Sequence, residues 1–327
     1  MYKKVLCILT SIAFLFGNVC AKELVPGGES IGIQVSYDGV LVSGTYTFMA
    51  GNQQIDPSHV MKANDLIVAI NSVKVTSLQD LANEMNKYQE SINDLTITII
   101  RNDKKQDVNI QTSYDKTGFH SGLYVKDKIT GVGTISYYDP ETGRYGALGH
   151  EIMDSDTNTF AKVHEGNIYP AIVDGIQKAK KNVPGEKEAT IDFTKTLGNV
   201  DLNSSLGIFG QYDILPENKQ AIPVGDHNQV HTGKALIYTV LSGNQIEMYE
   251  INITKVNKQN VKDIKGIELS VNDPALAKLT NGIIQGMSGS PIIQDGKIVG
   301  ALTHVVTSDP MRGYGVFIDW MLEESVS

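Results

Sequence analysis

Short stretches of alternating apolar and polar residues dominate the pattern of the chain. This alternation predicts half-buried strands over residues 31–35, 66–70 and 95–100. One segment differs, because apolar residues recur at helical spacing over 78–88 behind a Thr76–Ser77 capping pair. The first third of the chain therefore reads as a small, mostly β module with a single helix.

The rest of the chain continues in short β-like runs that are separated by turn clusters. Such runs cover residues 131–138, 235–241 and 245–256, with turn residues at 139–143 and 242–244. Many short strands at regular spacing are typical of a sandwich or barrel. We therefore predict two domains with a boundary near residue 113, a module over 23–113 and a second β domain over 114–327.

The N-terminus has the order of a secretory signal. Lys3 and Lys4 precede the apolar stretch Val5–Phe16, and small residues follow up to Ala21. We predict that residues 1–21 are a signal peptide cleaved after Ala21, or an uncleaved membrane anchor. A lipoprotein site at Cys20 is a weaker alternative. In each case the body of the protein is exported, close to the membrane.

The charge and cysteine content of the chain exclude several kinds of partner and chemistry. The chain has 327 residues, a formal net charge of −9 and a sequence pI of about 5.3. An acidic chain lacks the counterion release that drives nucleic-acid binding, so nucleic acid is excluded as a partner. Both cysteines, Cys7 and Cys20, lie in the leader. The exported part therefore has no disulfide, thiolate metal ligand or cysteine nucleophile.

The run from Ser58 to Asn71 resembles the corresponding pattern of PDZ domains. Val60 replaces the usual Ala, and Asn64 replaces Gly at a position where Asn also tolerates the left-handed conformation. The resemblance implies a peptide groove beside the predicted helix. The alternative is a β spacer that binds nothing. The backbone amides predicted to receive a peptide end are those of Ser30, Ile31, Gly32 and Ile33.

The segment Gly286–Pro291 carries the sharpest chemical pattern, a hydroxyl flanked by small residues before a predicted strand. Glycines allow a tight turn whose N–H groups converge on one point. Ser288 could then attack a carbonyl while the N–H groups of Gly286 and Ser288 form the oxyanion hole. The alternative is a glycine-rich β-turn without activity.

A serine nucleophile needs a base, and His150 follows directly after a predicted strand over 145–149. His304 reads as a core residue or a pocket wall. His227 and His231 are four residues apart, but Asn228 stands where a metalloprotease helix needs Glu. We therefore predict no metal site.

Asp273 is the candidate for the carboxylate that would orient the base. It precedes Pro274, so the alternative is that it caps a helix. Asp154 and Asp156 are further candidates. The lysine-rich stretch Lys178–Lys187 predicts a solvated loop or helix face.

The combination of motifs resembles the SpoIVB peptidases, a family of signalling serine proteases from spore-forming bacteria. The resemblance rests on Gly286–Pro291, on the segment Gly146–His150, on the PDZ-like module and on the N-terminal export segment. It implies a chymotrypsin-like double β-barrel after the PDZ module. It also implies that His150 is the general base, Asp273 the acidic member and Ser288 the nucleophile.

The resemblance further implies a role in sporulation. Such proteases act in the space between the forespore and mother-cell membranes, where they cut their own N-terminal segment and a membrane-bound regulator of an intramembrane protease. That cleavage activates a late sigma factor, and no cofactor is required. The competing class is a non-catalytic PDZ scaffold with an inactive barrel. An esterase is disfavoured because a predicted strand, and not a helix, follows Ser288.

Overall fold

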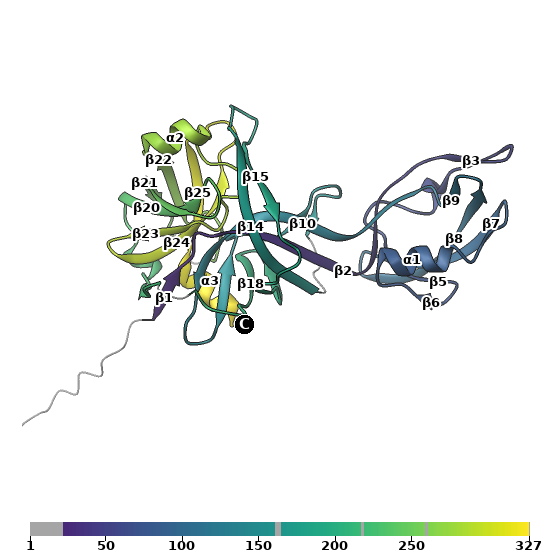
Figure 1. Ribbon diagram of the computed structural model, residues 1–327, viewed down its shortest axis with the longest axis horizontal. Coiled ribbons are helices and arrows are strands. Elements are labelled where there is room, and N and C mark those ends of the chain that lie inside the picture. The colour runs from purple at the N-terminus through teal and green to yellow at the C-terminus, as the bar shows by residue number, and fades with distance from the viewer. Residues whose placement is uncertain (1–21, 161–164, 217–218, 259–260, 327) are drawn as a thin grey trace, which may run out of the picture.

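The structure is a computed structural model that describes residues 22–160, 165–216, 219–258 and 261–326. Two parts are visible in Figure 1, a larger β body and a smaller module joined to it by two long strands. The predicted signal peptide or anchor over 1–21 lies outside the described residues. Among the helices that are described, none has the length and apolarity to cross a membrane.

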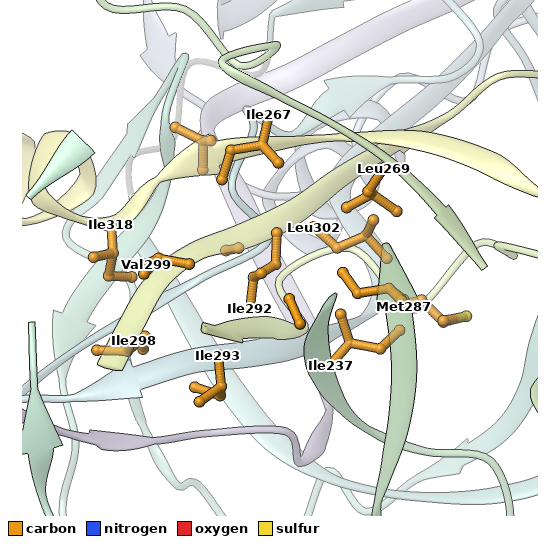
Figure 2. Packing of buried hydrophobic residues seen from close by; sticks show 14 of the residues in the cluster. Ile237, Ile267, Leu269, Met287, Ile292, Ile293, Ile298, Val299, Leu302 and Ile318 are labelled. Carbon is orange, nitrogen blue, oxygen red and sulfur yellow. The ribbon is translucent and has the colours of Figure 1, made fainter. Parts of the chain in front are cut away.

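The C-terminal half of the larger part is a closed barrel whose order is β20-β21-β22-β25-β24-β23. Its core is mainly aliphatic, and Figure 2 shows Ile237, Leu269, Ile292 and Leu302 among its side chains. The six strands of the barrel are β20 (Gly233–Val240), β21 (Ile246–Val256), β22 (Ile267–Val271), β23 (Pro291–Gln294), β24 (Lys297–Val305) and β25 (Arg312–Phe317). Two short helices accompany it, α2 (Pro274–Thr280) and α3 (Ile318–Ser325).

The N-terminal half of the larger part is a sheet with its own core around Ile31, Ile135, Tyr145 and Ile208. The order β18-β11-β10-β2 runs across it, and β14 pairs with the other edge of β2. Its main strands are β1 (Glu23–Pro26), β2 (Ser30–Thr45), β10 (Leu123–Tyr138), β11 (Arg144–Ala147), β14 (Glu165–Gln177), β15 (Glu186–Ile191) and β18 (Gly207–Gln211). Shorter strands complete it: β12 (Met153–Asp154), β13 (Thr159–Phe160), β16 (Gly198–Asn199), β17 (Leu202–Ser204) and β19 (Ile222–Pro223).

The smaller module has a separate core that includes Val40, Met61 and Ile97. Its helix begins where the sequence predicts, because the Ser77 side chain accepts a hydrogen bond from the Asp80 N–H. Asn64 has a φ of 75°, which is the left-handed conformation expected at that position. The module contains β3 (Phe48–Ala50), β4 (Gln53–Ile55), β5 (Leu66–Ile70), β6 (Val73–Lys74), α1 (Leu78–Met85), β7 (Asn93–Arg101), β8 (Lys104–Asp115) and β9 (Gly118–His120).

The two parts share strands β2 and β10, which pair along most of their length. The first half of β2 belongs to the larger part, since Ile31, Ile33 and Val35 pack in its core. The second half, with Val40 and Val42, packs in the small module. Strand β2 therefore contributes to both cores, and the boundary near residue 113 stays a prediction. The predicted mainly β architecture, with a small module that contains one α-helix, is confirmed.

Candidate active site

A cavity of about 810 Å³ opens where the two halves of the larger part meet. His150 enters it from the segment after β11, and Ser288 enters it from the turn before β23. His304, at the end of β24, also lines it. The fold thus brings the predicted nucleophile and the predicted base to one cavity, although 138 positions separate them in the sequence (288 − 150).

The turn that carries Ser288 is held by the cores on both sides of it. The side chain of Met287 is completely buried in the barrel core and is labelled among the aliphatic side chains of Figure 2. Gly289 has a φ of +96°, and a Cβ at this position would lie 2.0 Å from the carbonyl oxygen of Thr134. Only glycine fits this close approach of two backbones.

Two amides of this turn are free to bind an oxyanion. Within the described residues, the N–H groups of Gly286 and Ser288 donate to no hydrogen-bond acceptor. The neighbouring N–H groups of Met287 and Gly289 are occupied, by the carbonyl oxygens of Ile284 and Leu302. The two free amides are those that the sequence predicts for the oxyanion hole.

His150 follows an unusual turn, because Leu148 and Gly149 both have positive φ angles, of 67° and 71°. A left-handed leucine costs about 1–2 kcal/mol, which the surrounding packing must offset. The Nδ1 atom of His150 lies 2.7 Å from the carbonyl oxygen of Glu151. Because a carbonyl only accepts, Nδ1 carries the proton and Nε2 keeps its lone pair. His150 therefore has the tautomer that a general base requires.

Burial lowers the pKa of His150 below its usual value of 6.5. The imidazole is therefore neutral near pH 7. The ring of His304 lies against it, with 4.7 Å between the ring centroids. Burial and the neighbouring His150 lower the pKa of His304 to about 4. Two uncharged imidazoles thus share the cavity, and His304 is a pocket wall, as the sequence suggests.

The hydroxyl of Ser288 donates to the carbonyl oxygen of Thr303 at 2.8 Å. In this arrangement the hydroxyl proton of Ser288 is directed at Thr303 and not at His150. The hydroxyl would have to leave the carbonyl of Thr303 before it donates to His150.

The family model of SpoIVB peptidase S55 matches residues 117–322, and the PDZ domain model matches residues 31–112. The chain belongs to the SpoIVB peptidase S55 family. It is therefore a serine peptidase with a PDZ domain, and its substrates are peptides or proteins.

Solved structures with similar parts have low overall similarity. The Rv3671c protease of M. tuberculosis, in its active form, is 14% identical with a TM-score of 0.37, and the match covers 61% of this chain and 74% of that protein. The PDZ domain of an SdrC-like protein from Listeria monocytogenes is 24% identical with a TM-score of 0.23, covering 28% of this chain and 90% of that domain. No curated protein matches the chain.

Asp273 does not reach the cavity of the peptidase. It is absent from the residues that line the cavity, and it is the N-cap of α2. Its carboxylate accepts hydrogen bonds from the N–H groups of Ala275, Leu276 and Glu250. The structure therefore supports the capping alternative, and it does not bring Asp273 to His150.

The other two candidate carboxylates are bound to groups other than His150. Asp154 is completely buried, accepts a hydrogen bond from the hydroxyl of Tyr37 at 2.6 Å and pairs with Lys126 at 2.8 Å. Asp156 pairs with the same lysine. Burial opposes ionisation of Asp154, but hydrogen bonds from Lys126 and Tyr37 outweigh it and lower its pKa to about 2.

The predicted peptide-binding backbone at Ser30–Ile33 is wrong. In this part of β2, one edge pairs with β10 and the other with β14. A strand that is paired on both edges has no free amides for an added peptide. The alternation that marks Ile31 and Ile33 reports the core of the peptidase and not a PDZ groove.

One possible ligand set for a metal ion lies outside the cavity. Atoms of Asp226, His227 and Asp319 lie within 4.8 Å of one another. His227 is already paired with Asp319, at 2.6 Å from Nδ1. His231 pairs instead with Asp295, so the two histidines do not form a common site.

The environment of Lys187 differs from the one that the sequence pattern predicts. The lysine-rich stretch predicts solvent exposure, but Lys187 is 6% exposed and lines the cavity. The available signal was the position of Lys187 on strand β15 between Glu186 and Glu188, whose side chains are exposed, because successive side chains of a strand point to opposite faces.

Proposed function

We propose that the protein is an exported serine endopeptidase in which Ser288 is the nucleophile and His150 the general base. The observation that carries the proposal is the shared cavity, in which His150 presents an unprotonated Nε2 beside a turn with two free amides. A serine, a neutral imidazole and a pair of convergent N–H groups are the minimum for acyl transfer.

The reaction follows from these groups. The Ser288 hydroxyl turns from Thr303, gives its proton to Nε2 of His150 and attacks the peptide carbonyl. The N–H groups of Gly286 and Ser288 bind the oxyanion, and His150 returns the proton to the leaving amine. Water, activated by His150, then hydrolyses the ester on Ser288. The carbonyl of Glu151 keeps the imidazole in one tautomer, which is the role usually given to an aspartate.

We place the reaction in sporulation signalling on the basis of family membership. The charged and apolar order of residues 1–21 supports export across the cytoplasmic membrane. The substrates we propose are the protein's own N-terminal segment and a membrane-bound regulator of an intramembrane protease, in the space between the forespore and mother-cell membranes. Cleavage of the regulator would lead to activation of a late sigma factor.

A peptide ligand of the PDZ domain would need another edge than Ser30–Ile33. In the small module, Leu123–Lys126 of β10 pairs with β2 on one side, and no other described strand covers its second side. Helix α1 contacts β10, and the N–H of Leu78 at its start donates to Asp127 at 2.8 Å. We propose the space between α1 and this part of β10 as the peptide groove.

The test is self-cleavage of the purified chain. The wild-type protein is expected to shorten at its N-terminus, and Ser288→Ala is expected to abolish the cut while its thermal unfolding stays unchanged. Mass spectrometry of the intact protein would record both products. Retained trimming in pure Ser288→Ala would reject the nucleophile.

The same sample decides the alternative of a non-catalytic scaffold. A scaffold would give no trimming in the wild type and no covalent adduct with a fluorophosphonate, a reagent that modifies activated serines. An adduct mapped to Ser288 in the wild type would exclude the scaffold.

A further inference from the structure

Lys187 is a buried amine that acyl transfer, as described above, does not use. It lies on β15, and its Nζ atom lies within hydrogen-bond distance of three hydroxyls, those of Ser30, Thr134 and Thr239 at 2.9, 3.3 and 3.0 Å. Among the described residues it forms no ion pair with a carboxylate. A buried lysine without a counter-charge is costly, so its retention calls for an explanation.

The directions of these hydrogen bonds are determined by the turn below them. The hydroxyl of Thr134 donates to the carbonyl oxygen of Gly286 at 2.7 Å. Since a hydroxyl has one proton, the oxygen of Thr134 must accept from Lys187. The amine has N–H groups to donate in both its charged and its neutral form. A directed chain therefore runs from Lys187 through Thr134 to the Gly286 carbonyl.

The backbone of Lys187 holds the preceding peptide group. Its N–H donates to the carbonyl oxygen of Gln285 at 3.0 Å. In a trans peptide the N–H points opposite to the C=O, so this bond directs the N–H of Gly286 away from β15. The side chain also packs on the glycine, since a Cβ added to Gly286 would lie 3.0 Å from Cδ of Lys187.

Both peptide groups that flank Gly286 are thus tied to Lys187. Gly286 has a φ of +89°, and glycine is the residue most free to change its backbone conformation. Thr134 adds a third connection, because its N–H donates to the carbonyl oxygen of Ser288 at 3.0 Å. The peptide group that supplies the Gly286 N–H is therefore held directly, through the carbonyl of Gln285. The peptide group that supplies the Ser288 N–H lies between the two whose carbonyls Thr134 binds, those of Gly286 and Ser288.

We propose that Lys187 is a positioning residue for acyl transfer, which acts through Thr134 and its own backbone to keep the N–H groups of Gly286 and Ser288 directed at the developing oxyanion. The inference rests on the proposed function, since it assumes that these amides bind the oxyanion. Burial lowers the pKa of Lys187 to about 7, which agrees with an amine that is held for its hydrogen bonds and not for its charge.

The test measures the rate at which a fluorescent fluorophosphonate modifies Ser288 in the full chain. The Ser288 oxygen bonds to phosphorus, fluoride leaves and His150 takes the proton. Lys187→Met and Thr134→Val are each expected to lower the limiting rate of modification about 10- to 100-fold, because misplaced oxyanion donors act in the transition state. The reagent concentration for half-maximal rate is expected to change less than about threefold.

Two further variants separate positioning from general stability. Thr134→Ser keeps the hydroxyl and is expected to restore the rate to within about threefold of wild type. Thr239→Val removes another partner of Lys187 that does not contact Gly286, and it is expected to keep the wild-type rate. If thermal unfolding shows that Lys187→Met does not fold, the comparison of Thr134→Val with Thr134→Ser tests the proposal instead.

The outcomes distinguish the two proposals. Equal rates in wild type, Thr134→Val and Lys187→Met overturn the role of Lys187 but leave the nucleophile in place. A decrease in the modification rate of Thr239→Val as large as that of Thr134→Val also overturns the role of Lys187. The effect would then come from the loss of any hydrogen-bond partner of the buried amine, and not from the connection to Gly286. A wild-type chain that is not modified at Ser288 overturns the proposed function and this inference together.

Discussion

The turn that carries Ser288 and the segment that carries His150 are held in different ways. The contacts of the Ser288 turn come from the interior of the peptidase, with Thr134 and Leu302 binding its backbone and Met287 buried in the barrel. The segment after His150 is held at its start by Asn203, which accepts from the N–H of Ile152. At its end it is held by Asp154.

The partners of Asp154 link the segment after His150 to the strands that join the two domains. Tyr37 and Lys126 belong to β2 and β10 at the point where these strands leave the peptidase for the PDZ domain. The turn of the nucleophile is thus held from the interior of the peptidase, whereas the segment that follows the base is also attached to the connection between the domains. We expect changes in the first region to abolish the site and changes in the second to adjust it.

Gly289→Ala has the largest expected effect, because it disrupts the region that is held by the core. The new Cβ would lie 2.0 Å from the Thr134 carbonyl at a φ of +96°. We expect a loss of about 3 kcal/mol or more in the free energy of unfolding and no detectable modification of Ser288. Urea denaturation and fluorophosphonate labelling would measure the two effects.

Gly296→Ala is the matched control, since Gly296 has a φ of +73° but open space around its Cβ position. It is expected to cost only about 1–2 kcal/mol and to leave labelling intact. Equal losses in the two variants would show that the close approach of Gly289 to Thr134 is not required.

Asp154→Ala tests the second region. It leaves the hydroxyl of Tyr37 and the ammonium of Lys126 without their buried partner. We expect a loss of about 2 kcal/mol in unfolding free energy and a slower modification of Ser288. Asp156→Ala removes an exposed partner of the same lysine and is expected to cost less than about 1 kcal/mol. An unchanged labelling rate in Asp154→Ala would show that the position of His150 does not depend on the connection between the domains.

The pH dependence of modification is expected to report His150. The base must be neutral, and burial lowers its pKa, so the rate should stay high as the pH falls to 6.5 and decrease only below it. Below the midpoint the rate decreases about tenfold per pH unit. His304→Gln is expected to keep the midpoint below 6.5. A midpoint above 6.5 would show that His150 is not the buried, neutral imidazole described here.

Asp273 is expected to give the smallest effect. Asparagine caps a helix nearly as well as aspartate, so Asp273→Asn should keep the labelling rate within a fewfold of wild type. Asp273→Ala is expected to cost about 1 kcal/mol of stability. A member of a catalytic triad would instead lose about 10⁴-fold activity in the asparagine variant, and that result would return Asp273 to the site.

Local patterns predict the elements that local chemistry controls. Ser77 begins the helix of the PDZ domain, and Asn64 takes the left-handed turn, as their side chains favour. The turn at Ser288 is marked by its glycines. Long-range pairing is beyond such patterns, because an alternating strand such as 31–35 fits a PDZ edge and a peptidase core equally well.

Lys187 illustrates the same limit for the site. A lysine in a charged stretch predicts exposure, but hydroxyls of Ser30, Thr134 and Thr239, which lie far away in the sequence, offset the cost of its burial. Asp273 shows the converse, since its local role as a helix cap, which the following proline indicates, is the one that the structure supports.

The central claim is that Ser288 is the nucleophile and His150 its base, and one experiment tests both residues. The full chain is treated with a fluorophosphonate at pH 7.5, and the modified residue is mapped by mass spectrometry in the wild type and in His150→Ala. We predict an adduct on Ser288 in the wild type and a rate at least about 10³-fold lower in the variant. An adduct on another serine, or equal modification of Ser288 in both proteins, would contradict the account.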